Sequence, residues 1–375
     1  RLSYIAEPYA RKVTNTTQGQ KTAMKLFTVI GARPQFIKAS VVSKAIQEAN
    51  GITETIVHTG QHFDSNMSDV FFNQLNIPRP SHQLDIHGGN HGAMTGRMLE
   101  QLEALMLQEK PDRVMVYGDT NSTLAGALAA AKLHIPVAHV EAGLRSFNMK
   151  MPEEINRILT DQVSDILFCP TDAAVKNLQN EGFGDKPVAI EKVGDVMQDA
   201  ALLFAKKAAA PAGVNVPGEF ILATLHRAEN TDDPERLANI VAALNEIHTT
   251  KMPVVLPLHP RTRAAVERNG LKLNVHLIDP VGYFEMVWLL DHCRLVLTDS
   301  GGVQKEAYFF SKPCVTMRDQ TEWVELIEAG VNVLAGANLG NILKAVSLCE
   351  TRAVISGDLY GGGRAAEAVI NALIK

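Results

Sequence analysis

The sequence predicts an α/β protein made of two Rossmann-like domains, each containing a doubly wound parallel sheet. Short β-rich runs alternate with helical stretches from Lys25 onward. The alternation stops once, at residues 205–218, where lysines, alanines, prolines and glycines form a stretch typical of an interdomain linker. It then restarts at Phe220. Repeated strand–helix–strand order implies parallel strands covered by helices on both faces, and two such sheets imply a cleft between them.

Composition is that of a large soluble protein and excludes several classes. The 375 residues are 46% hydrophobic and 21% charged, so neither disorder nor a disulfide scaffold is expected. The net charge of −5 argues against nucleic-acid or acidic-membrane partners, which require a basic face. No apolar run approaches the roughly 18 residues of a membrane span. Four scattered cysteines without a C-x-x-C pair suggest buried thiols in a reducing, cytoplasmic compartment.

The predicted elements follow one another in the order that a doubly wound fold requires. Residues 1–23 are polar, are not expected to be a signal peptide and are left out of the fold, because Met24 begins a strand-like run. The spacing of four between Ile37, Val41 and Ala45 predicts an amphipathic helix after the first strand. The predicted strands lie at residues 25–30, 53–59, 113–117, 137–140, 166–169 and 189–193, and then at 220–224, 254–257, 275–278, 295–298 and 314–317.

Three ranges follow from this pattern. The N-terminal domain is expected at 24–200 and the C-terminal domain at 201–360. Residues 361–375 are expected to form a last helix that packs back on the N-terminal domain.

A phosphate site is predicted where the first strand ends. Gly31 allows a tight turn there, and Arg33 and Lys38 place two cations beside the N-terminus of the following helix. A pair of cations is equally often a solvated surface feature, and the absence of G-K-[ST] excludes a Walker A loop. The residues therefore indicate anion capture without defining the anion.

Three carboxylates occur at later strand ends or helix starts of the same domain. Asp119 and Glu141 each follow a predicted strand, and Glu153 lies in the first turn of a helix. Each acid alone is ordinary cap or first-turn chemistry. Because the carboxyl ends of parallel strands share one edge of the sheet, the three together favour an acid/base site.

The second domain supplies a complementary set at its own strand ends. His226 and His259 follow its first and second strands. The turn Ser300-Gly301-Gly302 exposes backbone N–H groups at a helix N-terminus, which suits a diphosphate. The combination of this turn with neighbouring histidines is a stronger signal than the turn alone.

Two further motifs predict no cofactor. Residues 361–366 satisfy the letters G-x-G-x-x-A but lack the strand–helix–strand context of a dinucleotide site. Residues 87–92 hold two histidines without a third ligand at helical spacing, so a glycine-rich loop is expected there and not a metal site.

Taken together, the motifs resemble one family, the non-hydrolysing UDP-N-acetylglucosamine 2-epimerases, bacterial enzymes of the GT-B fold. The resemblance runs from Met24 to the end of the chain in the family's order. The matching segments are G-A-R-P-Q-F-I-K from Gly31, H-T-G-Q-H from His58, G-D-T-N-S-T from Gly118, H-V-E-A-G-L-R from His139, P-E-E-I-N-R from Pro152, H-R-A-E-N from His226, D-S-G-G-V-Q-K-E from Asp299 and M-R-D-Q-T-E-W from Met317.

The resemblance implies reversible inversion at carbon 2 of a UDP-N-acetylhexosamine, of the UDP-GlcNAc to UDP-ManNAc type, for surface polysaccharide precursors. The family eliminates UDP to a 2-acetamidoglucal and adds it back with protonation on the other face. The expected partners are a UDP-sugar and a second copy of the chain in a homodimer. The residues implied for acid/base work are Asp119, Glu141, Glu153 and His226. Those implied to bind UDP are Arg33, Lys38, His259, Ser300, Gly301, Gly302, Glu306 and Arg318, with Arg157 as supporting charge.

A finer resemblance concerns the sugar. The stretches F-N-M-K-M-P-E-E and Q-T-E-W look most like the branch that acts on UDP-2,3-diacetamido-2,3-dideoxy-glucuronate, the alternative substrate. Arg145 and Lys150 are then the candidates to pair the sugar carboxylate. Phe63 and Asp64 depart from members activated by a second UDP-GlcNAc molecule, which carry an arginine followed by glutamine or glutamate. The rival hypotheses are a GT-B glycosyltransferase, a hydrolysing epimerase and a non-catalytic UDP-sugar sensor.

Overall fold

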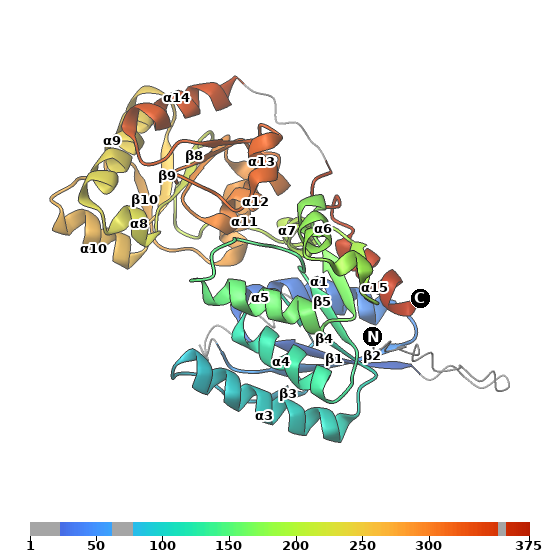
Figure 1. Cartoon of the computed structure of the whole chain (residues 1–375). Helices are drawn as coiled ribbons and strands as arrows, with labels where there is room; N and C mark the ends of the chain where they lie inside the picture. The colour runs from blue at the N-terminus through green and yellow to red at the C-terminus, as the bar shows by residue number, and fades with distance from the viewer. Residues whose placement is uncertain (1–22, 62–77, 352–357) are drawn as a thin grey trace, which may run out of the picture.

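The computed structural model describes residues 23–61, 78–351 and 358–375 and contains two parallel sheets (Figure 1). The first sheet has seven strands in the order β3-β2-β1-β4-β5-β6-β7, and the second has six in the order β10-β9-β8-β11-β12-β13. Every described strand pairs in parallel with its neighbours. The predicted fold class, two Rossmann-like sheets in one chain, is confirmed.

Each sheet with the helices packed on it forms one lobe. In the first lobe the strands are β1 (Met24–Ile30), β2 (Ile52–His58), β3 (His82–Gln83), β4 (Arg113–Tyr117), β5 (Val137–Val140), β6 (Ile166–Cys169) and β7 (Ala189–Lys192). Its helices are α1 (Arg33–Glu48), α3 (His91–Glu109), α4 (Asn121–Lys132), α5 (Pro152–Val163), α6 (Asp172–Asn180) and the short 3-10 helix η1 (Phe183–Asp185). Helix α7 (Val196–Ala205) leads to the second lobe.

In the second lobe the strands are β8 (Ile221–Thr224), β9 (Val254–Pro257), β10 (His276–Ile278), β11 (Leu295–Thr298), β12 (Cys314–Thr316) and β13 (Asn332–Leu334). The helices are α8 (Ala228–Thr231), α9 (Pro234–Thr250), α10 (Pro260–Arg268), α11 (Tyr283–His292), α12 (Gly301–Phe309), α13 (Val324–Glu328) and α14 (Leu339–Glu350). The chain ends in α15 (Ala365–Ile374), which packs against α1 and α7.

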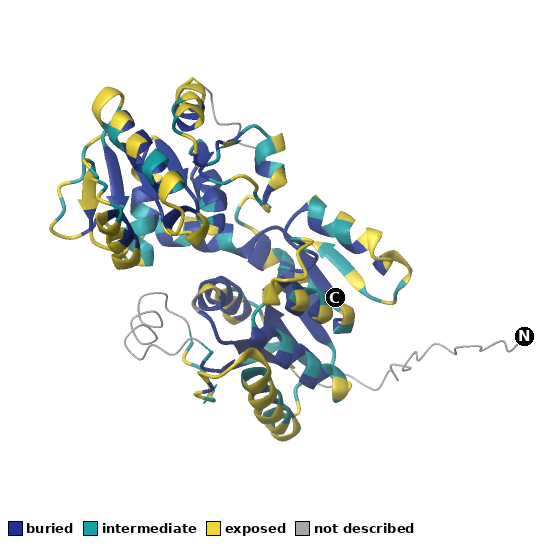
Figure 2. Cartoon of the chain, turned by 60° about the vertical axis from the view of Figure 1, so that its left-hand side comes forward, coloured by how far each residue is buried: buried dark blue, intermediate teal, exposed yellow. Residues whose placement is uncertain are grey.

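Helices cover both faces of the first sheet. Helix α3 buries Met98, Leu102 and Met106, spaced by four, and packs beside α4 on one face, while its other side is exposed (Figure 2). Helices α1, α7 and α15 share a separate apolar cluster with the strands. This two-sided cover explains why β5 is buried along its whole length and β4 is buried at every residue but its first. None of the helices in the described ranges is long and apolar enough to cross a membrane.

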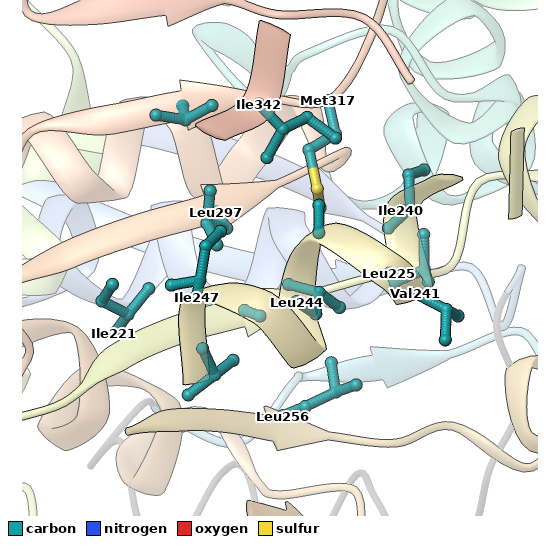
Figure 3. Packing of buried hydrophobic residues seen from close by; sticks show 14 of the residues in the cluster. Ile221, Leu225, Ile240, Val241, Leu244, Ile247, Leu256, Leu297, Met317 and Ile342 are labelled. Atoms are coloured by element: carbon teal, nitrogen blue, oxygen red, sulfur yellow. The ribbon is translucent and has the colours of Figure 1, made fainter. Parts of the chain in front are cut away.

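The second lobe has its own core, in which α9 lies on the sheet (Figure 3). Ile240, Leu244 and Ile247 of α9 are buried with Leu256 of β9 and Leu297 of β11. Burying one such side chain stabilises the fold by roughly 1.5–3 kcal/mol. A core of this size in each lobe holds the strand ends, and hence the site residues, on rigid supports.

The two segments that connect the lobes contact each other. The backbone N–H of Asp195, just before α7, donates to the carbonyl of Tyr360 at 2.8 Å. Gly194 has a φ of +93°, and a side chain there would clash with that carbonyl. Helix α7 contributes Phe204 to the first-lobe cluster and Ala201 to the second-lobe cluster. The expected boundary between residues 200 and 201 therefore falls inside one helix.

Candidate active site

The predicted site residues follow the carboxyl ends of central strands in both sheets. In the first sheet Tyr117 and Val140, the last residues of β4 and β5, are paired in register. In the second sheet Thr298 of β11 pairs with Thr224 of β8 and Thr316 of β12. The order of strands reverses between β1 and β4 and again between β8 and β11. Doubly wound sheets bind ligands at such switch points.

The turn after β1 is fixed by a buried glutamine. The Gln35 side-chain oxygen accepts hydrogen bonds from the N–H groups of Gly31 at 2.8 Å and Ala32 at 3.0 Å. Its amide nitrogen donates to the carbonyl of Tyr117 at 2.7 Å and to the Thr120 hydroxyl at 3.0 Å. Gln35 thus ties the predicted phosphate turn to the loop that carries Asp119. A side chain at Gly31 would clash with two neighbouring hydroxyl groups.

Glu141 is held between two lysines. One carboxylate oxygen is paired with Lys38 of α1, and the other lies 3.7 Å from Nζ of Lys305 of α12. Burial alone would raise the pKa of Glu141, but the charges of Lys38 and Lys305 outweigh it and lower the pKa to about 2. Glu141 is therefore ionised at neutral pH. Arg33 opens α1 beside Lys38, and its side chain lies outside what the structure describes.

Arg157 of α5 gathers two further acids. It is paired with Asp119 and lies 2.9 Å from Glu154. Glu154 also accepts backbone hydrogen bonds from Ser146 and Phe147, which outweigh burial and lower its pKa. Glu153, the acid singled out from the sequence, is exposed, whereas its neighbour Glu154 is buried and supports the loop before α5.

A second network of buried polar side chains includes His139 of β5. His139 lies 2.7 Å from Asp161 and 2.7 Å from the carbonyl of Gly118, the residue before Asp119. Arg145 lies 2.7 Å from Asp161 and makes two hydrogen bonds to Glu181, at 2.6 and 2.8 Å. The expectation that Arg145 pairs a sugar carboxylate is wrong, because its guanidinium is buried and already occupied by these two acids.

In the second lobe, buried Asp299 organises the strand ends. Its carboxylate accepts hydrogen bonds from the N–H groups of His226 and Arg227 and from the Asn230 amide. The His226 ring Nδ1 lies 3.5 Å from the same carboxylate, and the ring is half exposed. Asp299 therefore fixes the position of His226 while leaving the ring accessible.

The turn Ser300-Gly301-Gly302 opens α12 as predicted. Trp323 Nε1 donates to the carbonyl of Gly301 at 2.9 Å, and a side chain at Gly301 would clash with Glu322. Nothing lies within 4 Å of the position that a Gly302 side chain would take. Open space next to a helix N-terminus suits an anionic group.

The remaining predicted UDP contacts flank this turn. Arg318 follows β12 and is paired with Glu229 at 3.2 Å and Glu322 at 2.8 Å. His259 caps α10, with its ring accepting from Arg261 N–H at 3.3 Å, and is exposed. Glu306 lies in α12 and is partly buried.

The structure joins the two strand-end sets at Glu141. Lys305 comes from the second lobe, and its Nζ lies 3.7 Å from Glu141 of the first lobe. The sequence analysis missed Lys305 and Asp299 as site residues, although both lie in the quoted D-S-G-G-V-Q-K-E segment. It also missed Gln35 and His139, which act through backbone groups. In the described part of the chain, no cluster of three or more His, Cys, Asp or Glu residues could hold a metal ion.

Comparisons with known proteins show the family to which the chain belongs. A family model described as UDP-N-acetylglucosamine 2-epimerase matches residues 44–374. UDP-2,3-diacetamido-2,3-dideoxy-D-glucuronate 2-epimerase of Pseudomonas aeruginosa is 67% identical over 94% of this chain and 100% of its own length. The UDP-GlcNAc 2-epimerase of Methanocaldococcus jannaschii, solved with UDP-GlcNAc and UDP, matches with a TM-score of 0.80 and 44% identity over 94% of this chain and 99% of that one. The UDP-GlcNAc 2-epimerase of Neisseria meningitidis, solved with UDP-GlcNAc bound, matches with a TM-score of 0.82 and 32% identity over 94% of this chain and 100% of that one. This chain belongs to the UDP-N-acetylglucosamine 2-epimerase family, a family of isomerases.

Proposed function

We propose that this protein inverts the configuration at carbon 2 of UDP-2,3-diacetamido-2,3-dideoxy-D-glucuronate. The observation that carries the choice of sugar is the 67% identity to the Pseudomonas aeruginosa enzyme of that name, along its whole length. The solved relatives named for UDP-GlcNAc are more distant, at 44% and 32% identity. UDP-GlcNAc is the second candidate, because those two structures hold it.

The proposed chemistry is an elimination followed by re-addition. A base removes the proton from carbon 2, the electron pair forms the double bond to carbon 1, and the bond from carbon 1 to UDP breaks. UDP then adds back to the 2-acetamidoglucal while carbon 2 receives a proton on the opposite face. Negative charge develops on the departing diphosphate, where fixed cations and backbone N–H groups stabilise it. Arg33, Lys38 and the Ser300-Gly301-Gly302 turn are assigned to that task, with His259, Glu306 and Arg318 beside it.

Proton transfer is assigned to Asp119, Glu141, Glu153 and His226. An ionised Glu141 suits a base and not an acid, because its carboxylate carries no proton to donate at neutral pH. Asp119, Glu153 and His226 are more exposed and are the candidates to exchange protons with water. The guanidinium of Arg157 forms an ion pair with Asp119 and so holds that carboxylate in place.

A sugar carboxylate would need a cation in the site, since a buried unpaired carboxylate is costly. Arg145 is excluded by its pairing with Asp161 and Glu181. Lys150 is exposed in the loop before α5 and is the remaining candidate.

The deciding experiment offers both UDP-sugars separately to the protein in deuterium oxide and follows carbon 2 by NMR. We expect faster epimerisation of the uronate, with deuterium incorporated at carbon 2 of the product. Preference for UDP-GlcNAc would replace the first substrate with the second. Product without deuterium at carbon 2 would reject the elimination mechanism for either sugar.

We further propose that the protein is a homodimer that works in the cytoplasm on precursors of surface polysaccharide. Met151, which caps α5, and Ile155 and Leu159 within the helix are 37–46% exposed and recur every four residues, forming an apolar stripe suited to a subunit contact. The four cysteines are buried free thiols, as is usual in a reducing compartment. Sedimentation of wild type and of Ile155→Arg tests the dimer, and unchanged mass in the variant would place the contact elsewhere.

A further inference from the structure

Lys305 joins the two lobes at the candidate site. It lies one turn into α12 and is only 5% exposed. Its Nζ is 2.5 Å from a carboxylate oxygen of Asp195, 3.7 Å from Glu141 and 4.2 Å from the centroid of the Trp323 ring. A lysine buried this deeply requires paired charges, and Lys305 takes both from outside its own sheet.

Asp195 is fixed independently of Lys305. One of its carboxylate oxygens accepts from the N–H of Met197 at 2.8 Å and so caps α7. Its backbone N–H donates to Tyr360, where the two lobe connections meet. The lysine is therefore anchored at the lobe connection on one side and directed at Glu141 on the other.

We propose that Lys305 is a positioning residue for the epimerisation: from the second lobe it orients the Glu141 carboxylate. The inference rests on the proposed function, in which Glu141 serves proton transfer. Lys38 alone would hold one carboxylate oxygen and leave the other free to turn. With Lys305 on the second oxygen, both oxygens have a fixed place relative to the diphosphate turn of the same helix.

The charged groups around Lys305 and Glu141 indicate how the loss of Lys305 would affect Glu141. Lys38 of α1, Lys305 of α12 and Arg157 of α5 act on Glu141, while Asp195, Glu141 and Glu325 act on Lys305. An opposite charge this close lowers the pKa of a carboxyl group by about 1 to 3 units. Removing Lys305 is therefore expected to raise the pKa of Glu141 and to move the acidic limb of the pH–rate profile to higher pH.

The test compares Lys305→Met with Lys305→Arg in the full-length protein. For Lys305→Met we expect kcat to fall about tenfold or more, because Glu141 is misplaced. We expect the Kd for UDP to stay within about twofold, so that kcat and binding separate. Lys305→Arg keeps the charge and should recover most of kcat. Lys251→Met, which removes a surface pair with Glu350 at 2.7 Å in the same lobe, is the matched control and should change neither.

Asp195→Asn separates positioning of Glu141 from a mere tie between the lobes. If Lys305 acts through Glu141, this variant keeps more of kcat than Lys305→Met does. Equal loss in both variants, or an unmoved acidic limb in Lys305→Met, would overturn the proposal.

A measurement without turnover distinguishes this proposal from the proposed function. In protein labelled with ¹⁵N-lysine, the Nζ signal absent from Lys305→Met identifies Lys305, and Glu141→Gln should shift that signal while Glu350→Gln should not. A signal insensitive to Glu141→Gln would overturn the inference. If wild type converts neither sugar, the proposed function fails, and the lysine signal still decides whether Lys305 acts on Glu141.

Discussion

Glu141 forms ion pairs with a lysine from each of the two lobes. Its φ of +72° is unusual for a residue with a side chain, and it sits directly after β5, where the backbone must turn to aim the carboxylate at Lys38 and Lys305. Such strain is retained when the surroundings over-determine it, and here two ion pairs do so. Geometry and charge at this residue both serve one state, an ionised and oriented carboxylate.

This state predicts how stability depends on pH. The pKa of Glu141 is lowered from 4.5 to about 2, so its ion pairs stabilise the fold above pH 4.5 and are lost as the pH falls towards 2. The shift corresponds to a contribution of these ion pairs to the free energy of unfolding on the order of 3 kcal/mol. Glu141→Gln should therefore lower stability at pH 7 and flatten its decline between pH 4.5 and 3, measured by urea unfolding. Glu350→Gln, which removes a surface acid, should leave the slope unchanged, and equal slopes in wild type and Glu141→Gln would contradict the assignment.

At the scale of elements, the sequence predicts most of the sheet and little of the side-chain pairing. The eleven predicted strands are all present, because buried parallel strands form apolar runs between helices. The two strands that were not predicted, β3 and β13, are short strands at sheet edges, and the two residues of β3 are too few for a pattern. From the predicted strand ends we expected the acids and histidines to lie near the carboxyl edges of the two sheets. The pattern did not separate Glu153 from buried Glu154, nor reveal that distant Asp161 occupies Arg145, since such pairings depend on tertiary structure.

Helix α12 offers a test at its N-terminus, where the two glycines differ. Gly302→Ala places a methyl group in open space, so the free energy of unfolding should change by less than about 0.5 kcal/mol. The methyl group would nevertheless occupy the space assigned to the diphosphate, and UDP affinity measured by calorimetry should fall about tenfold. Gly340→Ala, at the start of α14 in the same lobe, is the matched control and should bind UDP normally. Normal UDP binding by Gly302→Ala would remove this turn from the proposed site.

In the whole molecule, function depends on how the lobes are joined as much as on either sheet. Helix α7 packs against α1 and α15 on one side and against α11 and α12 on the other. Asp199 of α7 accepts hydrogen bonds from Ala365 and Ala366 and so anchors the start of α15. Helix α15 thus packs on the first lobe, and the second lobe is connected to the first lobe at both of its ends. Lobe motion would then be a rotation about these connections.

The contact between the two connections gives the last prediction. Gly194 has a φ of +93°, and an alanine there would clash with the Tyr360 carbonyl and lie 2.9 Å from the Cα of Gly361. Gly194→Ala should therefore lower the free energy of unfolding by about 2 kcal/mol or more, the sum of backbone strain and displaced chain. Because the neighbouring Asp195 holds Lys305, kcat should fall as well, while UDP binding to the second lobe persists. Gly184→Ala in η1, with no positive φ and nothing within 4 Å, is the control for urea unfolding and turnover. If Gly194→Ala matched this control in both measurements, the lobe connection would not be the rigid pivot that the packing indicates.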